Sequence, residues 1–389
     1  MSHAMFHDAL IVGGGPAGLF AARELARRGF SVVLFEEHER VGDPVHCTGV
    51  LGTESFDEFD VPRTSILNAL ETVRMTAPGG ISVAYSPRSI EAVVIDRRAF
   101  DESLADQARA AGAELHPSTR VTSLAVETGA IRALAGDAGV RARIAILACG
   151  ASYGLQRRMG LGMPQAYLQT AQRELRAATP GDVELHFGSA VAPGGFAWAV
   201  PVVRADGAYV RVGVMATTDA PLWYERMLAR LAPRWGIAEA REAPRQKMLP
   251  LGTIERTFDD RLLVVGDAAG LVKPTTGGGI YYSLMSAAIA ADIAADGLHA
   301  DRLEAADLSE YETRWRARIG SELAAQASLR RVSERLTDDE IDALFDLART
   351  EGVMPLVRKT AQFNQHRHLI KALFKHPPVR RVLFRSLTG

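Results

Sequence analysis

The chain has 389 residues, of which 47% are hydrophobic and 23% are charged, and its formal net charge is −1. A chain of this length and apolar content can bury more than one core, so two domains are expected. No apolar run reaches the ~18 to 20 residues of a membrane-spanning helix. The chain also lacks a nucleic-acid-binding motif and a basic face with interleaved aromatic residues, which argues against a nucleic-acid partner.

Cysteine usage indicates the redox setting. The two cysteines, Cys47 and Cys149, have no paired spacing, and no cleavable signal precedes the first apolar run. The histidines form no metal-ligand cluster. We therefore expect a reducing, cytoplasmic location and no bound metal.

The first predicted unit is a β-α-β arrangement near the N-terminus. A short apolar run, residues 9–12, precedes Gly13, Gly15 and Gly18 at the G-x-G-x-x-G spacing, and a helical Ala/Leu/Arg segment follows. The next strand, FSVVLFEE, carries Glu36 near its end. The glycines allow a pyrophosphate to approach the helix N-terminus, and Glu36 can accept a hydrogen bond from a ribose hydroxyl. The sequence predicts a dinucleotide site here; the alternative is a glycine-rich turn without a ligand.

The middle of the chain is rich in predicted strands. Four segments run apolar or alternate between apolar and polar residues: AYLQTAQRELRAA, DVELHFG, GGFAWAVPVV and GAYVRVGVMAT. We interpret them as a sheet that roofs the cofactor.

A second glycine-rich loop follows the predicted strand RLLVV. Asp267 stands at the carboxyl end of that strand, and Gly277, Gly278 and Gly279 open a helix of small apolar residues. Ligands of open α/β sheets bind at the carboxyl ends of strands, so Asp267 can hold a polyhydroxyl chain while the glycines let a flat ring lie against the backbone. A nicotinamide dinucleotide needs no such second element, whereas a reduced flavin carries negative charge that a helix N-terminus stabilises. The two loops together favour FAD; the alternative is a strand-turn-helix corner without a ligand.

The C-terminal region is predicted to be helical, most clearly in DLSEYETRWRARIGSELAAQASL, and it ends in a basic tail. From Gly352 onward the tail has no acidic residue, and its basic residues border an apolar stripe. Pro377 and Pro378 are expected to divide it into two short helices. The tail is either a helix pair packed on the body or a surface for anionic lipid headgroups, and the sequence leaves both open. The basic residues are Arg358, Lys359, Arg367, Lys371, Lys375, Arg380, Arg381 and Arg385.

Several segments resemble a known family. GGGPAG, VIDRRAFDESL and GDAAGLVKPTTGGGI resemble the FAD-dependent monooxygenase and reductase superfamily, and PVHCTG with PGGFAWAVP resembles more narrowly its geranylgeranyl reductase family. The resemblance covers residues 10–298 and is vague in the C-terminal region. It implies an α/β fold with a Rossmann-like FAD-binding domain, an inserted β-rich substrate domain and a helical C-terminal region. The expected ranges are 1–70, 95–155 and 255–300 for the FAD-binding domain, 71–94 and 156–254 for the substrate domain, and 301–389 for the helical region.

The resemblance also implies roles for single residues. Those implied to contact FAD are Ala17 and Glu36 at the adenosine half, Arg97, the backbone near Val121 at the adenine, Asp267 at the ribityl chain, and Gly279 and Ile280 at the ring. Cys47 and Thr48 fall where the family has a cysteine loop beside the isoalloxazine, so Cys47 is our candidate catalytic residue, as a group that shapes the site. The alternative for Cys47 is a small buried residue in a turn.

The segment PGGFAWAVP resembles the family's P-x-x-Y-x-W-x-F-P strand, which lines the isoprenoid cavity. Pro193, Trp198 and Pro201 match, whereas Phe196 replaces a tyrosine and Val200 replaces a phenylalanine. Phe196, Trp198 and Val200 are therefore our candidate substrate-binding residues. The alternative is a core strand with an aromatic face.

Three functions remain open from the sequence. The first is a reductase that adds hydrogen to isolated double bonds of a polyprenyl lipid or diphosphate; the others are a flavin monooxygenase or halogenase and a non-catalytic flavoprotein. A halogenase would need a lysine in the N-terminal third, yet the first lysine is Lys247. Cys149 and Gly150 replace the Asp-Gly pair of many flavin hydroxylases. The sequence does not choose between NADPH and a ferredoxin as the electron donor.

Overall fold

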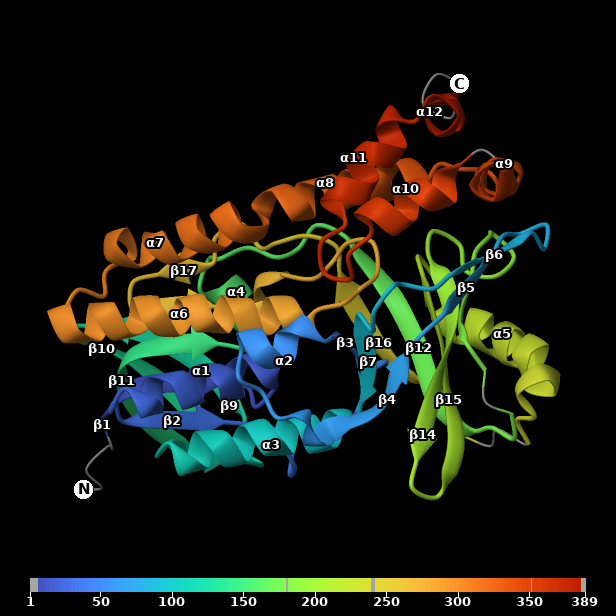
Figure 1. The fold of residues 1–389 in the computed structure, drawn as a ribbon. Helices are drawn as coiled ribbons and strands as arrows, with labels where there is room; N and C mark the ends of the chain where they lie inside the picture. The colour runs from blue at the N-terminus through green and yellow to red at the C-terminus, as the bar shows by residue number, and fades with distance from the viewer. Residues whose placement is uncertain (1–5, 180, 239–241, 351, 386–389) are drawn as a thin grey trace.

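The computed structural model describes residues 6–179, 181–238, 242–350 and 352–385. Two large sheets, a small sheet between them and a helical C-terminal region make up the described chain (Figure 1). This arrangement confirms the predicted fold class. The ranges given for the domains stay a prediction.

The first sheet carries the predicted β-α-β unit. Its order is β17-β18-β11-β1-β2-β8, and β9 and β10 extend it antiparallel from β11. Strand β1 pairs parallel with β11 and β2, and β11 pairs parallel with β18, so these strands end at one edge of the sheet. The strands are β1 (Phe6–Val12), β2 (Val32–Phe35), β8 (Glu114–His116), β9 (Val121–Glu127), β10 (Ala130–Ala135), β11 (Ala138–Leu147), β17 (Phe258–Asp259) and β18 (Leu262–Val264).

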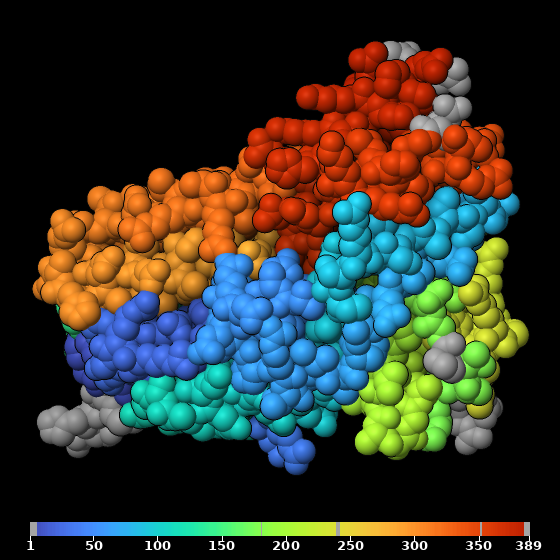
Figure 2. Space-filling model, in the orientation of Figure 1, coloured from blue at the N-terminus to red at the C-terminus, as the bar shows by residue number. Residues whose placement is uncertain are grey.

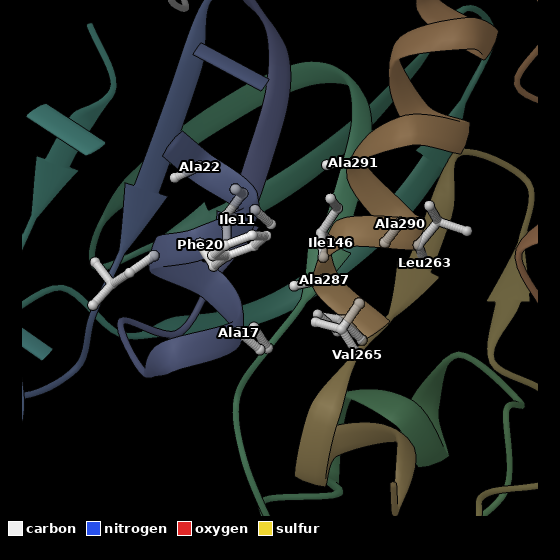
Figure 3. Packing of buried hydrophobic residues seen from close by; sticks show 14 of the residues in the cluster. Ile11, Ala17, Phe20, Ala22, Ile146, Leu263, Val265, Ala287, Ala290 and Ala291 are labelled. Carbon is white, nitrogen blue, oxygen red and sulfur yellow. The ribbon is translucent and has the colours of Figure 1, made fainter. Parts of the chain in front are cut away.

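Two helices with small side chains lie side by side against this sheet. Helix α1 (Pro16–Arg27) follows the first glycine loop, and α6 (Ile280–Ala300) follows the second. Figure 3 shows them packed over β1, β11 and β18, where alanines of both helices are buried. Because an alanine face has little bulk, both helices approach the sheet closely, and this fixes both helix N-termini at its carboxyl edge.

The second sheet contains the four strands predicted in the middle of the chain. Its order is β16-β12-β15-β14-β13-β5-β6, and all its pairings are antiparallel except that of β13 with β5. Helix α5 (Ala220–Trp235) covers its outer face (Figure 1). The strands are β5 (Val73–Thr76), β6 (Ser82–Tyr85), β12 (Tyr167–Arg176), β13 (Val183–His186), β14 (Phe196–Arg204), β15 (Gly207–Ala216) and β16 (Arg245–Pro250).

The small third sheet connects the two large ones. It has the order β3-β7-β4 and is antiparallel throughout. Its strands are β3 (Val50–Gly52), β4 (Ile66–Leu70) and β7 (Ala92–Ile95). Helix α2 (Glu54–Glu58) follows β3, the 3-10 turn η1 (Arg63–Ser65) precedes β4, and α3 (Arg97–Ala110) follows β7, whereas α4 (Gly154–Arg158) contacts β9 of the first sheet. Strand β3 follows the Cys47 loop, so the third sheet holds one end of that loop.

The C-terminal region is helical, as predicted. Figure 1 shows α7 and α8 running along the first sheet and the remaining helices above the second. In Figure 2 the last helices, coloured red, project from the body. The prolines at 377 and 378 separate the last two helices, as expected. In the described ranges, no helix combines the length and apolar character needed to cross a bilayer. The helices are α7 (Ala305–Trp315), the π-helical turn η3 (Arg316–Gly320), α8 (Ser321–Ser333), α9 (Asp338–Thr350), α10 (Val353–Thr360), α11 (Arg367–Lys375) and α12 (Pro377–Arg385).

Candidate cofactor and substrate site

The first glycine loop has the tight geometry that its spacing predicts. Gly13 has a φ of +107°, and a Cβ there would lie 2.5 Å from the carbonyl oxygen of Ala148. A Cβ at Gly18 would lie 2.0 Å from the carbonyl oxygen of Gly13, so a side chain at either position would collide with backbone. At Gly15, by contrast, a Cβ would meet nothing within 4 Å. The loop is therefore closed against the sheet and open at Gly15, where a phosphate of a dinucleotide fits.

Glu36 shapes this loop from the end of β2. Its carboxylate accepts hydrogen bonds from the backbone N–H of Gly14 at 2.6 Å and of His38 at 2.9 Å. The carbonyl of Glu36 accepts from the N–H of Thr119, two residues before the buried Val121. The structure thus brings Glu36 and Val121 to the same side of the loop. Their contacts with an adenosine stay a prediction, as does that of Ala17, which is buried at the start of α1.

The second glycine loop lies at the same edge of the first sheet. Val12, Leu147 and Val264 are neighbours in the registers of β1, β11 and β18, so the residues after them emerge together. Asp267 follows β18 in the 3-10 turn η2 (Gly266–Ala269). Its backbone carbonyl accepts from the Tyr153 hydroxyl at 2.7 Å, whereas its carboxylate forms no hydrogen bond or ion pair with the described part of the chain.

The glycine triplet leaves room for that carboxylate. A Cβ at Gly279 would lie 2.6 Å from Oδ1 of Asp267, and Gly277 has a φ of +73°. Gly279 is also the N-cap of α6, where no side chain caps the helix, so Ile280 begins the helix with free backbone N–H groups. An unpaired carboxylate beside a bare helix N-terminus fits the polyhydroxyl chain and ring end of FAD.

Cys47, Thr48 and Arg97 come together between the sheets. The Cys47 thiol accepts a hydrogen bond from the N–H of Gly49 at 3.3 Å and lies beside the Arg97 guanidinium. Burial alone would lower the pKa of Arg97, but the Asp101 carboxylate at 2.8 Å and the Cys47 thiol outweigh burial and raise this pKa above its ordinary value. Arg97 therefore stays charged and holds a positive charge next to Cys47.

A partly buried charge network supports the Cys47 loop, and sequence reasoning missed it. Arg211 donates to the carbonyl of Thr48 at 2.6 Å and to the carboxylate of Glu174 at 2.9 Å. Glu174 also binds Arg204, which binds Asp96 at 2.7 Å, and Asp96 caps the N-terminus of α3. Burial alone would raise the pKa of Glu174, but the two arginines outweigh it and lower this pKa. The network ties the second sheet to the loop; its only local signal was the presence of charged residues within apolar strands.

The predicted substrate residues share one face of β14. Phe196, Trp198 and Val200 alternate along the strand, and all three belong to one apolar cluster. The Trp198 ring lies over Gly213 of β15, where a Cβ would come 2.3 Å from it. The Trp198 side chain is buried, and its Nε1 has no hydrogen-bond partner in the described chain. The face is therefore apolar, and the indole N–H is a donor without a partner in the described chain.

Leu249 of β16 connects this face to the second glycine loop. A Cβ at Gly277 would lie 2.9 Å from Cδ2 of Leu249, and Leu249 packs in the same apolar cluster as Trp198. The proposed ring position and the aromatic face of β14 are therefore neighbours.

Among the described residues, no group of three or more His, Cys, Asp or Glu side chains could hold a metal ion.

Comparisons with known proteins show the family of the chain. Residues 11–57 match the family model of the NAD(P)-binding Rossmann-like domain. The chain is 32% identical to digeranylgeranylglycerophospholipid reductase 2 of Methanothermobacter thermautotrophicus, over 87% of this chain and 91% of the relative. It is 29% identical to digeranylgeranylglycerophospholipid reductase of Methanocaldococcus jannaschii, over 87% and 89% of the two chains.

Solved structures share the fold. A geranylgeranyl bacteriochlorophyll reductase-like protein of Thermoplasma acidophilum superposes with a TM-score of 0.85 at 22% identity, over 98% of this chain and 99% of the other. The halogenase PltM, in a mutant form in complex with FAD, superposes with a TM-score of 0.68 at 16% identity, over 97% and 85%. The halogenase is therefore a more distant neighbour in structure. On the sequence match to the M. thermautotrophicus reductase, the chain belongs to the digeranylgeranylglycerophospholipid reductase family.

Proposed function

We propose that this protein is an FAD-dependent reductase of isolated double bonds in a polyprenyl group carried by a glycerophospholipid. The observation that carries the proposal is the contact of Leu249 with both the second glycine loop and the apolar cluster of β14. This contact supports a position for a long apolar substrate beside the ring end of the cofactor. The names of the curated relatives support the same reaction and substrate class.

Different residues bind the cofactor and the alkene in this proposal. Gly13, Gly15 and Gly18 receive the pyrophosphate, and Asp267 receives the ribityl chain. When bound and reduced, the flavin supplies the electrons for the reaction. Two electrons and two protons are added across each double bond, which becomes a single bond. Such an alkene is unactivated, so its placement in a dry, apolar site matters more than polar contacts.

The proposed site uses the polar groups of Cys47 and Trp198. Cys47, beside the charged Arg97, shapes the site next to the ring, and the Trp198 N–H is available to an oxygen of the substrate. We expect Cys47→Ala to retain FAD and to lose most of the turnover, while Cys47→Ser retains more because it keeps a hydrogen-bonding group of similar size.

The proposal is tested with a defined reductant, so the test does not depend on whether NADPH or a ferredoxin is the donor. The FAD-loaded protein is reduced with dithionite without oxygen and mixed with digeranylgeranylglycerol phospholipid. Mass spectrometry should show the mass of two hydrogens added per reduced bond. No gain on any polyprenyl lipid, together with oxygenation or halogenation of an aromatic compound in air, would establish the monooxygenase or halogenase alternative instead. A bound flavin that no donor reduces would establish a non-catalytic flavoprotein.

A second part of the proposal concerns contact with the membrane that holds this lipid. The basic side chains of Lys371, Lys375, Arg380 and Arg381 on α11 and α12 are exposed. Val379 and Leu383 of the apolar stripe are buried against other C-terminal helices, whereas Phe384 is exposed. We therefore expect attachment to anionic headgroups through charge rather than through insertion of the stripe.

A further inference from the structure

Lys273 is a buried lysine in the second glycine loop. Its side chain is only 3% exposed. Its ammonium donates hydrogen bonds to the carbonyl oxygen of Phe363 at 2.9 Å and to Oδ1 of Asn364 at 2.5 Å, and lies 4.5 Å from the centre of the Phe363 ring. Among the described residues, no carboxylate is within ion-pair distance of it. Lysines are rarely buried without such a partner, because removing the ammonium from water is costly.

This ammonium lies next to the glycine triplet. The N–H of Lys273 donates to the carbonyl of Gly278 at 3.1 Å, and the N–H of Gly277 donates to the carbonyl of Lys273 at 2.9 Å. A Cβ at Gly278 would lie 3.7 Å from Nζ of Lys273. The ammonium is therefore next to the space that the missing side chain of Gly278 leaves, close to a ring that would bind at the triplet.

The ionisable groups around Lys273 come from four elements. Glu54 of α2 is one hydrogen bond away, through Asn364, and Glu322 of α8 accepts from the N–H of His366. Tyr282 of α6 lies with its ring centre 6.0 Å from Nζ. Burial lowers the pKa of Lys273 to about 7, against the opposing effect of the two glutamates. Burial, followed by the charge of Lys273, lowers the pKa of His366 to about 4, so this histidine is neutral near pH 7.

We propose that Lys273 sets the reduction potential of the flavin by placing a positive charge beside Gly278, and that it takes up a proton when the flavin is reduced. The inference rests on the proposed function, which places the ring against the glycine triplet. A reduced flavin is anionic, and a cation in a dry site stabilises it strongly. By reciprocity, the anion stabilises the protonated lysine.

Reduction couples two electrons to the uptake of two protons. The oxidised flavin takes two electrons from the donor and one proton from water. In the same transition the neutral amine of Lys273 takes a second proton from water and becomes the ammonium. Above the pKa that Lys273 has in the oxidised protein, the reduction potential of the wild type should therefore fall more steeply with pH. One extra proton per two electrons adds about 30 mV per pH unit to this slope.

A purely structural lysine makes a different prediction. If Lys273 only anchored Phe363 and Asn364 to the loop, its removal would change stability or FAD affinity but would leave the pH slope of the potential unchanged. The slope therefore separates the two roles.

The experiment is a dye-equilibrated potentiometric titration of the FAD-loaded protein from below to above neutrality. At pH values below 7, Lys273→Met should have a lower reduction potential than the wild type. It should also lack the extra pH dependence of the potential. Lys273→Arg keeps the charge but does not titrate in this range, so it should keep a high potential without the extra slope. Lys359→Met, on the exposed face of α10, is the matched control and should follow the wild type. An unchanged potential and slope in Lys273→Met at full FAD occupancy would overturn the inference.

A second readout does not depend on the Met variant folding. The chain has five lysines, so ¹³Cε-labelled lysine gives few NMR signals. One signal should titrate near pH 7 in the oxidised protein, move to higher pH on reduction, and disappear in Lys273→Arg. A signal with the same midpoint in both redox states would contradict the coupling. If the wild-type chain bound no FAD, the proposed function itself would fail. That outcome differs from an unchanged potential in Lys273→Met and from an NMR midpoint that is the same in both redox states.

Discussion

Oδ1 of Asp267 lies 2.6 Å from the point where a side chain at Gly279 would begin. The carboxylate therefore depends on the absence of that side chain, although the two residues belong to different elements, η2 and the start of α6. The aspartate and the last glycine of the triplet act as one unit of the site.

This relationship predicts non-additive variants. Gly279→Ala should displace the carboxylate and raise the dissociation constant of FAD about tenfold to a hundredfold, the effect of one lost charge-assisted hydrogen bond. Asp267→Ala should do the same, and the double variant should be little worse than either single variant. Flavin fluorescence titration gives the three constants. Gly139→Ala is the control, because a Cβ at that position meets nothing within 4 Å; additive losses would contradict the shared role.

The second prediction concerns the arginine beneath the Cys47 loop. Arg211→Met leaves the Thr48 carbonyl without its donor and Glu174 without one of its two arginines. Loss of these hydrogen bonds, of which the Arg211 end is buried, should lower the free energy of unfolding by about 1 to 3 kcal/mol. Denaturant unfolding measures the loss. The exposed Arg88 provides the control: its change to Met should stay within about 0.5 kcal/mol of the wild type, and an equal loss in both variants would remove the special role of Arg211.

The third prediction is the pH dependence of stability that arises from Lys273. Its pKa is lowered from 10.5 in the unfolded chain to about 7 in the folded one, chiefly by burial. Below about 7 both states hold the ammonium, and the penalty for burying it is present in full. Between about 7 and 10.5 the unfolded chain binds the extra proton, so the folded state gains stability as pH rises.

The comparison with Lys273→Met isolates this effect. The unfolding free energy of the wild type minus that of the variant should rise across this window by an amount on the order of a few kcal/mol. Thermal unfolding of both proteins at a series of pH values measures it. A difference that stays flat, or that falls with pH, would show that the buried lysine does not titrate there.

The fourth prediction concerns the exposed charges of the last helix. Arg380→Glu with Arg381→Glu should abolish pelleting with anionic vesicles, while neutral vesicles should bind neither form. Since exposed charges are screened beyond about 8 Å at physiological ionic strength, wild-type binding should weaken as salt rises. Changing Arg226 and Arg230, two exposed arginines of α5, to Glu gives the same change in net charge on another helix. Equal loss in both double variants would point to net charge alone, and no loss in either would leave the tail as packed scaffold.

The sequence predicted those parts of the site that depend on local patterns. The spacing of Gly13, Gly15 and Gly18 is set by one turn between a strand and a helix, so it could be read directly. Asp267 and the glycine triplet were recognisable for the same reason, because each flanks a regular element. The chain's membership in the reductase family was also predicted, from short loop segments, and the comparison with curated relatives confirms it.

The missed residues act over long separations. Lys273 and Asn364 are 91 positions apart, and Arg211 meets Thr48 across 163 positions. No periodicity links such partners, since the contacts form only when the sheets and the C-terminal helices are assembled. The tail shows the same limit: its amphipathic pattern was clear, but only the structure showed that Val379 and Leu383 face other helices.

The parallel pairing of β5 with β13 has a consequence for synthesis. The two strands are hydrogen-bonded neighbours, yet β5 leaves the ribosome roughly 100 residues earlier, which corresponds to about 5 to 20 s of translation. During that interval β5 and β6 form at most an isolated hairpin, which is marginally stable in water and has a free edge. The β5–β6 hairpin therefore keeps a free edge during synthesis until β13 emerges and covers it.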